Sequence, residues 1–195
     1  MNTKNEIYFY KEGYLRTSSS EYKLDDNNQY VHLTNQCLQV KNSEEYGQHE
    51  EGNTLSFDQF QQYLDSDEFL KSRPEFRRSG ARVIVERDIV PRMKDIVIDS
   101  FCSVKAIVNP NHRKHQFEFF GYDFMIDEDF RVWLIEVNSN PYIGTPNKYM
   151  KELVPKMIDE MFQLTIDTQY LPTDAYKQGI DSSDHAFELI YQERE

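Results

Sequence analysis

Two carboxylates and one carboxamide in a single apolar stretch have the residue types of a magnesium site. Asp123, Glu136 and Asn138 lie in QFEFFGYDFMIDEDFRVWLIEVN. Because side chains alternate along a strand, Glu136 and Asn138 would face one side, roughly 7 Å apart along the backbone. Carboxylate and amide oxygens suit Mg²⁺, which keeps coordination positions for phosphate oxygens. The pattern indicates a metal–nucleotide site. Its alternative is a solvent-facing acidic turn beside an unrelated glutamate.

Two strands must bring these side chains together, and we predict them at 117–126 and 131–138, around an acidic turn at 127–129. Near-continuous aromatic and β-branched residues predict strands that are buried on both faces. A turn of two or four residues would place Asp123 on the same face as Glu136, whereas an odd number would place it opposite. The residues expected to point the other way, into a core, are Trp133, Ile135 and Val137.

Other chemistries fit the sequence less well. A calcium-binding EF-hand loop that starts at Asp127 would need Gly at its sixth position and Glu at its twelfth, where the chain has Val132 and Asn138. The acidic run 25–28 fails similarly, because Tyr30 occupies the glycine position. Neither a Gly-rich phosphate loop nor a hydrolase nucleophile motif occurs. Phosphate contacts must therefore come from side chains or from a segment outside this chain.

Composition limits the class of protein. The 195 residues are enough for one domain, and the net charge of −12 argues against nonspecific nucleic-acid binding. No apolar run approaches the ~20 residues of a membrane span, and the N-terminus has no signal-peptide core. Cys37 and Cys102 are far apart, which favours reduced thiols over a disulfide framework.

Local patterns predict an α+β chain. The segment Glu6–Arg16 is typical of a hairpin that turns at Gly13. Helices are expected at 57–64, capped by Ser56, at 91–107 and at 148–164. The polar tail at 167–195 is expected to be loosely docked.

One stretch is locally basic despite the acidic chain. Between Lys71 and Lys94 there are eight basic residues and only three acids. This is either a solvated loop and helix face or a patch that attracts an acidic polypeptide.

Several sequence motifs of the chain resemble those of a known family. FFGYDFMIDEDFRVWLIEVNSNP is similar to the signature of the tubulin–tyrosine ligase-like family. The similarity extends upstream, where EGYLRTSS, YVHLTNQCLQ, YGQHEEGN and FDQFQQYL occur in the order that the family has. The resemblance covers roughly residues 6–165. It implies an ATP-grasp-like fold, an antiparallel sheet flanked by helices. Residues 1–166 would form the C-terminal part of that larger domain, and 167–195 a polar tail.

The resemblance also implies roles for individual residues. Thr34 and Asn35 would lie near the nucleotide. Arg16 would lie near the phosphates and the acceptor carboxylate, and it and Glu136 would be catalytic. The ligands of two Mg²⁺ ions that bridge the ATP phosphates would be Asp123, Glu136 and Asn138.

The implied function is an ATP-dependent ligase that attaches glutamate, glycine or tyrosine to an acidic tubulin tail through an acyl phosphate. Its location would be the cytoplasm, at microtubules and in cilia. SNPYIGTPN is more similar to glutamylating and glycylating members than to the tyrosine ligase. Family members carry further regions before the YLR block, so one alternative is an inactive microtubule-binding fragment. A third interpretation is an ATP-grasp ligase that acts on a small molecule.

Overall fold

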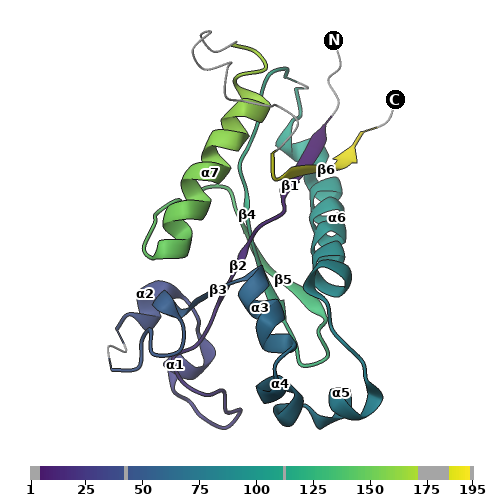
Figure 1. Cartoon of the computed structure of the whole chain (residues 1–195). Coiled ribbons are helices and arrows are strands. Elements are labelled where there is room, and N and C mark those ends of the chain that lie inside the picture. Colours follow the sequence, from purple (N-terminus) through teal and green to yellow (C-terminus); the bar gives the residue numbers. More distant parts are fainter. Residues whose placement is uncertain (1–4, 42–43, 112, 171–184, 194–195) are drawn as a thin grey trace. The chain divides into compact units, whose positions relative to one another are not determined.

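The computed structural model describes residues 5–41, 44–111, 113–170 and 185–193. The fold is α+β, with helices and small antiparallel sheets (Figure 1). Two compact units make up the chain. One contains the residues up to Lys11, Glu86–Ile143 and the residues from Val154 onward, and the other contains Glu12–Val85 and Gly144–Leu153.

The second of these units holds the strand pair β2 (Tyr14–Arg16) and β3 (Thr54–Ser56). The expected helix after Ser56 is confirmed as α3 (Phe57–Leu64). Ser56 and Gln59 form a capping box there, which satisfies main-chain groups at the first turn. The remaining short helices of this unit are α1 (Gln29–His32), α2 (Gln36–Gln39), η1 (Glu51–Asn53), α4 (Asp67–Ser72) and α5 (Pro74–Ser79).

Helix α6 (Val90–Val108) is the long helix of the first unit and confirms the helix expected after Pro91. It follows a π-helical turn, η2 (Val85–Ile89). Its first half carries the buried side chains Val90, Met93 and Val97. Its last turn does not follow the predicted stripe, because Ile107 is 79% exposed.

Strands β1 (Glu6–Tyr10) and β6 (Phe187–Gln192) pair antiparallel in the first unit, and Figure 1 shows them beside α6. Lys94 on α6 forms an ion pair with Glu188 at 2.8 Å, and Lys105 forms one with Glu193 at 2.9 Å. The expectation of a loosely docked tail is therefore wrong for residues 187–192, because an apolar strand there completes a ladder with β1. Part of the expected tail, 171–184, lies outside the described residues.

The hairpin predicted at Glu6–Arg16 is also wrong. Both strands form, but β1 pairs with β6 and β2 pairs with β3. Each strand finds its partner far along the chain, and local turn chemistry at Gly13 does not override those longer-range ladders. Gly13 instead leaves room for Phe57, because a Cβ there would lie 2.7 Å from the Phe57 ring.

Helix α7 (Lys148–Thr165) confirms the helix expected at 148–164 and includes Pro155. Asn147 begins it, since its Oδ1 accepts a hydrogen bond from the Met150 amide at 2.8 Å. Among the described residues, no helix has the length and apolar character needed to cross a membrane.

Candidate metal and nucleotide site

The hairpin of β4 (Gly121–Ile126) and β5 (Val132–Asn138) places Asp123 directly opposite Glu136. Ile126 pairs with Val132, so the turn at 127–131 has an odd number of residues. Regular pairing would then put Asp123 opposite Ile135. Instead, the register shifts between Asp123 and Phe124, which leaves Ile135 as the extra residue of a β-bulge. The bulge compensates for the odd turn, and both carboxylates face the same side.

The same bulge changes which apolar residues lie beside the carboxylates. Met125 pairs with Trp133, and Met125 shares a face of β4 with Asp123. Trp133 therefore lies on the carboxylate face, not on the opposite one as predicted.

The hairpin is also less buried than its sequence predicts. Trp133, Ile135 and Val137 are 56%, 59% and 41% exposed, so the expectation that they enter a core is wrong. The physical reason is that β4 and β5 form a sheet of two strands, and no other strand of the described residues pairs with them.

Asn138 joins the two carboxylates on this face. Its Nδ2 donates a hydrogen bond to Glu136 Oε1 at 3.2 Å, which leaves its amide oxygen unused by that bond. Asn138 pairs across the hairpin with Gly121. A Cβ at Gly121 would lie only 2.8 Å from Cβ of Pro141, so the exit loop after Asn138 packs directly on the glycine. The absence of a side chain at Gly121 thus allows Pro141 to pack against the end of the hairpin.

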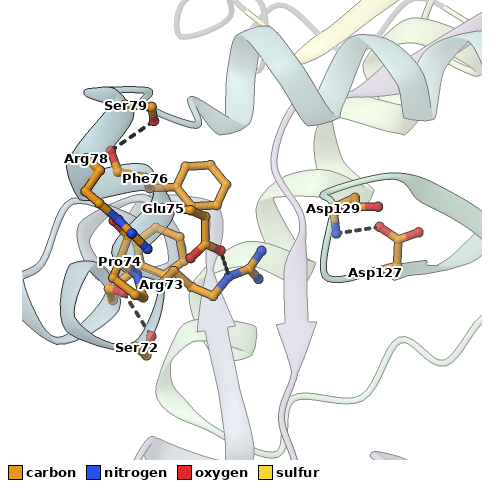
Figure 2. A network of polar contacts seen from close by, with 10 residues as sticks. Ser72, Arg73, Pro74, Glu75, Phe76, Arg78, Ser79, Asp127 and Asp129 are labelled. Carbon is orange, nitrogen blue, oxygen red and sulfur yellow. Dashed lines mark hydrogen bonds and ion pairs between the residues drawn. The ribbon is translucent and has the colours of Figure 1, made fainter.

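The acidic turn between β4 and β5 is stabilised by hydrogen bonds to the Asp127 carboxylate. Figure 2 shows the Asp129 amide directed at the Asp127 carboxylate, at 3.0 Å. The same carboxylate accepts hydrogen bonds from the Arg131 amide at 2.9 Å and from Trp133 Nε1 at 2.9 Å. The Trp133 hydrogen bond is the main reason that the pKa of Asp127 lies below its ordinary value. These bonds fix the turn and the Trp133 ring.

The oxygen atoms of Asp123, Glu136 and Asn138 are of the kind that bind a hard cation such as Mg²⁺. Asp123 and Glu136 supply carboxylate oxygens from adjacent strands, and Asn138 supplies a neutral amide oxygen. Among the described residues, no three His, Cys, Asp or Glu side chains gather into a metal-binding group. The proposed ligands do not form such a group, because one of the three is the amide oxygen of an asparagine.

Arg16 lies in the other compact unit, at the end of β2, where it pairs with Thr54 of β3. The main chain after it is anchored, because the Thr17 amide donates to Asn53 O at 3.0 Å and Thr17 Oγ1 donates to Glu50 at 2.9 Å. Arg16 is therefore the last residue of a short but firmly held strand.

Thr34 and Asn35 lie in the same unit as Arg16, between α1 and α2. Asn35 is the N-cap of α2, since its Oδ1 accepts a hydrogen bond from the Cys37 amide at 3.0 Å. Thr34 is half-buried. The cap gives Asn35 a structural role in addition to the one that the resemblance implies.

Two buried carboxamides, Gln39 and Asn53, organise this region and were missed in the sequence. Gln39 is 0% exposed; it donates to the carbonyls of Tyr30 and Leu33 at 2.9 and 2.6 Å and accepts from the Ser19 amide at 3.0 Å. Asn53 makes a comparable set of bonds. The available signal was the pair Gly52-Asn53, because both residues tolerate left-handed backbone. Their φ angles are 65° and 49°.

The basic stretch is mostly neutralised by ion pairs. Five of its eight cations pair with acids: Arg73–Glu75, Arg82–Asp65, Arg87–Asp88, Arg92–Asp95 and Lys94–Glu188. The other three, Lys71, Arg77 and Arg78, make no ion pair with any described residue. They lie on α4 and α5, and we call them the α4–α5 cations.

The helices that carry the α4–α5 cations are held together by side chains. Phe69 and Phe76 have ring centroids 5.5 Å apart, and the Arg73 guanidinium lies 5.3 Å from the centre of the Phe76 ring. Figure 2 shows Arg73 reaching Glu75, and Ser79 bonded to the Phe76 carbonyl. The cations are therefore displayed on an ordered surface.

Sequence comparisons relate the whole chain to known proteins. A sequence model described as "Tubulin-tyrosine ligase family" matches residues 2–177. The chain is 34% identical over 187 residues to "Tubulin glycylase 3B" of Tetrahymena thermophila, covering 95% of this chain and 14% of that protein. It is 29% identical over 199 residues to "Probable alpha-tubulin polyglutamylase Ttll1" of the same organism, covering 96% and 43%.

A third relative is "Inactive polyglycylase TTLL10" of Homo sapiens, 32% identical over 162 residues, with 83% of this chain and 23% of that protein covered. The chain spans less than half the length of each of these three relatives.

Proposed function

Because the chain belongs to the tubulin-tyrosine ligase family, we propose that the protein is an ATP-dependent ligase that joins an amino acid to a carboxylate of a tubulin tail. The cross-strand pair of Asp123 and Glu136, with Asn138 on the same face, is the observation that carries this proposal. The fold that goes with it is ATP-grasp-like, and the location is the cytoplasm, at microtubules and in cilia.

The three side chains on the β4–β5 hairpin would hold Mg²⁺ and the ATP phosphates. When bound, Mg²⁺ supplies positive charge where the γ-phosphate and an acceptor carboxylate, both anions, must approach each other. Asp123 and Glu136 supply the negative charge that retains the cation. Arg16 donates its guanidinium hydrogens to anionic oxygens, a geometry that suits phosphate and carboxylate. Thr34 and Asn35 are proposed to lie near the nucleotide.

The reaction has two steps. An oxygen of the tail carboxylate attacks the γ-phosphorus of ATP, so that ADP leaves and an acyl phosphate forms. The amine of the free amino acid then attacks the acyl carbon; it loses a proton, phosphate leaves, and an amide bond remains. Arg16 stabilises the oxyanion that develops on the acyl oxygen during the second step.

The transferred amino acid is proposed to be glycine or glutamate. The relatives include a tubulin glycylase and a probable alpha-tubulin polyglutamylase. The sequence of the exit loop, SNPYIGTPN, resembles that of glutamylating and glycylating family members. The α4–α5 cations support an acidic tail as the partner, because they keep exposed positive charge on a chain whose net charge is −12.

A second candidate is a microtubule-binding protein without transferase activity. The relative named an inactive polyglycylase favours it, since a chain with 32% identity to this one carries that name. This candidate needs the α4–α5 cations but not the carboxylates on the β4–β5 hairpin.

The experiment is a labelled amino-acid transfer assay on microtubules with ATP and Mg²⁺. It offers glycine, glutamate and tyrosine separately to the protein in its full natural length. We expect incorporation of glycine or glutamate that Glu136→Gln abolishes, while co-sedimentation with microtubules stays the same. Glu118→Gln, which changes an exposed acid nearby in the sequence, is the control and should retain both activities.

Two outcomes would contradict parts of the proposal. Transfer that persists in Glu136→Gln would make the metal assignment wrong. A folded wild-type protein that binds microtubules but transfers none of the three amino acids would favour the second candidate.

A further inference from the structure

Asn53 completes the strand ladder at the residue after Arg16, with its side chain in place of its main chain. In the β2–β3 pair, Arg16 lies opposite Thr54, so the next pair along would be Thr17 and Asn53. One bond of that pair is ordinary: the Thr17 amide donates to Asn53 O at 3.0 Å. The return bond cannot form in the usual way, because the Asn53 amide donates to Glu50 O at 3.1 Å. The Asn53 side chain replaces it, and Nδ2 donates to Thr17 O at 3.2 Å.

The rest of the Asn53 side chain is also engaged. Its Nδ2 donates to Ser19 Oγ at 2.8 Å, and its Oδ1 accepts from the Gly47 amide at 2.8 Å. The residue is 5% exposed, so these bonds form away from water, and the loss of one would leave a buried polar group unsatisfied. Its φ of 49° directs the amide to Glu50 and frees the side chain for Thr17.

The consequence concerns Arg16. Both main-chain polar groups of Thr17 bind one residue, so the backbone cannot rotate freely at the point where Arg16 ends β2. A three-residue strand would otherwise fray at its last residue, because one short ladder fixes few dihedral angles. The direction of the Arg16 side chain is therefore set by Asn53 as well as by the pairing with Thr54.

We propose that Asn53 is a positioning residue that acts on the ligase reaction through Arg16, an inference that rests on the proposed function. A catalytic side chain that is displaced by about 1 Å can lose on the order of 100-fold in rate. The effect of Asn53 should accordingly depend on the presence of Arg16.

The test uses Asn53→Asp in a double-mutant cycle with Arg16→Ala. Aspartate has nearly the same shape and also tolerates a positive φ, but it cannot donate to Thr17 O. Gln61→Glu is the matched control. Gln61 is a carboxamide of the same unit that donates to Val83 O at 3.1 Å and accepts from the Val85 amide at 2.8 Å.

We expect Arg16→Ala to lower kcat for amino-acid transfer by about 100-fold or more, and Asn53→Asp to lower it by about 10- to 100-fold. In the Arg16→Ala background, Asn53→Asp should change kcat by less than about twofold, because coupled residues are non-additive. Gln61→Glu should lower the unfolding temperature without lowering kcat. If the losses of Asn53→Asp and Arg16→Ala multiply, Asn53 does not act through Arg16.

A spectroscopic measurement decides the inference without relying on turnover. The Nε–Hε signal of Arg16 in a nitrogen–proton correlation spectrum is identified by its disappearance in Arg16→Lys. Asn53→Asp should shift or broaden this signal, and Gln61→Glu should leave it unchanged. An unchanged signal in Asn53→Asp would overturn the positioning role. A wild-type protein without transfer would overturn the proposed function, and the spectrum would still decide whether Asn53 orients Arg16.

Discussion

Asp123 and Glu136 face each other across the β4–β5 hairpin because two irregularities cancel. The turn has an odd number of residues, which alone would separate the two side chains to opposite faces. The bulge at Ile135 adds one residue to β5 and brings Glu136 back to the face of Asp123. The candidate metal site therefore depends on a backbone feature that belongs to neither ligand.

Gly121→Ala should weaken metal-dependent nucleotide binding several-fold. The added Cβ would lie 2.8 Å from Cβ of Pro141, whose ring cannot rotate away, so the exit loop and Asn138 must shift. Overpacking of this kind costs about 1–3 kcal/mol. The measurement is ATP binding with Mg²⁺, together with thermal unfolding.

Gly80→Ala provides the control for Gly121→Ala. Gly80 has a φ of 67° with nothing within 4 Å of the position of a Cβ, so alanine there strains the backbone without any clash. That variant should lose stability and keep its nucleotide affinity. Equal losses of affinity in the two variants would show that stability alone accounts for the effect of Gly121→Ala.

The hairpin should lose stability as the pH falls below about 4. The hydrogen bond from Trp133 and those from the turn amides lower the pKa of Asp127 in the folded state. A depressed folded pKa contributes stability above the unfolded value, about 3.9, and that stability is lost as pH falls through the folded pKa. Trp133, the single tryptophan, reports the change by its fluorescence between pH 6 and pH 2. Asp127→Asn should remove this pH dependence, and identical profiles for the two proteins would refute the assignment.

Regular helices and strands could be predicted from the sequence, whereas the exceptions to regular geometry could not. Apolar spacing and caps predicted α3, α6 and α7, and aromatic and β-branched composition predicted β4 and β5. The bulge at Ile135 has no residue signature, so strict alternation placed Trp133 on the wrong face.

Long-range contacts were the other source of error. The pairing of β1 with β6 joins the two ends of the chain, and no local pattern in Glu6–Arg16 indicates it. The role of Asn53 depends on a left-handed backbone angle and on the path of a distant segment. The acidic ligands could be proposed from residue types alone, but the residues that orient the site could be identified only from the structure.

Charge reversal of Arg77 and Arg78 to Glu should weaken binding to microtubules or to a polyglutamate peptide. These residues form no ion pair with the described part of the chain, so the reversal removes attraction without breaking an internal contact of that kind. The loss should be larger at low salt, where screening is weaker. Binding is measured by co-sedimentation at several salt concentrations.

Arg113→Glu combined with Lys114→Glu changes the net charge by the same amount in an exposed loop. This control should bind more tightly than the Arg77/Arg78 variant. Equal weakening in both double variants would mean that net charge decides the affinity, and would argue against the α4–α5 cations as a docking surface.

The stability of the unit that contains α3 should fall at alkaline pH. Burial raises the pKa of Tyr149 to about 12, and the nearby carboxylates of Glu12 and Asp58 add to the shift. Its hydroxyl donates to Gly13 O at 2.9 Å. Because the folded pKa lies above the ordinary value of about 10, the stabilisation is complete below pH 10 and is lost as pH rises toward 12. Urea unfolding at pH 8 to 11 should show this loss in the wild type and a smaller one in Tyr149→Phe.

Metal-dependent nucleotide binding is the most direct test of the candidate site on the β4–β5 hairpin. Trp133 lies on the carboxylate face, so its fluorescence can follow a titration with ATP in the presence and absence of Mg²⁺. We predict a saturable change that requires Mg²⁺, that disappears in Glu136→Gln and that persists in Glu118→Gln. A change that does not depend on Mg²⁺, or that is the same in Glu136→Gln as in the wild type, would contradict the assignment of Asp123, Glu136 and Asn138 to a metal–nucleotide site.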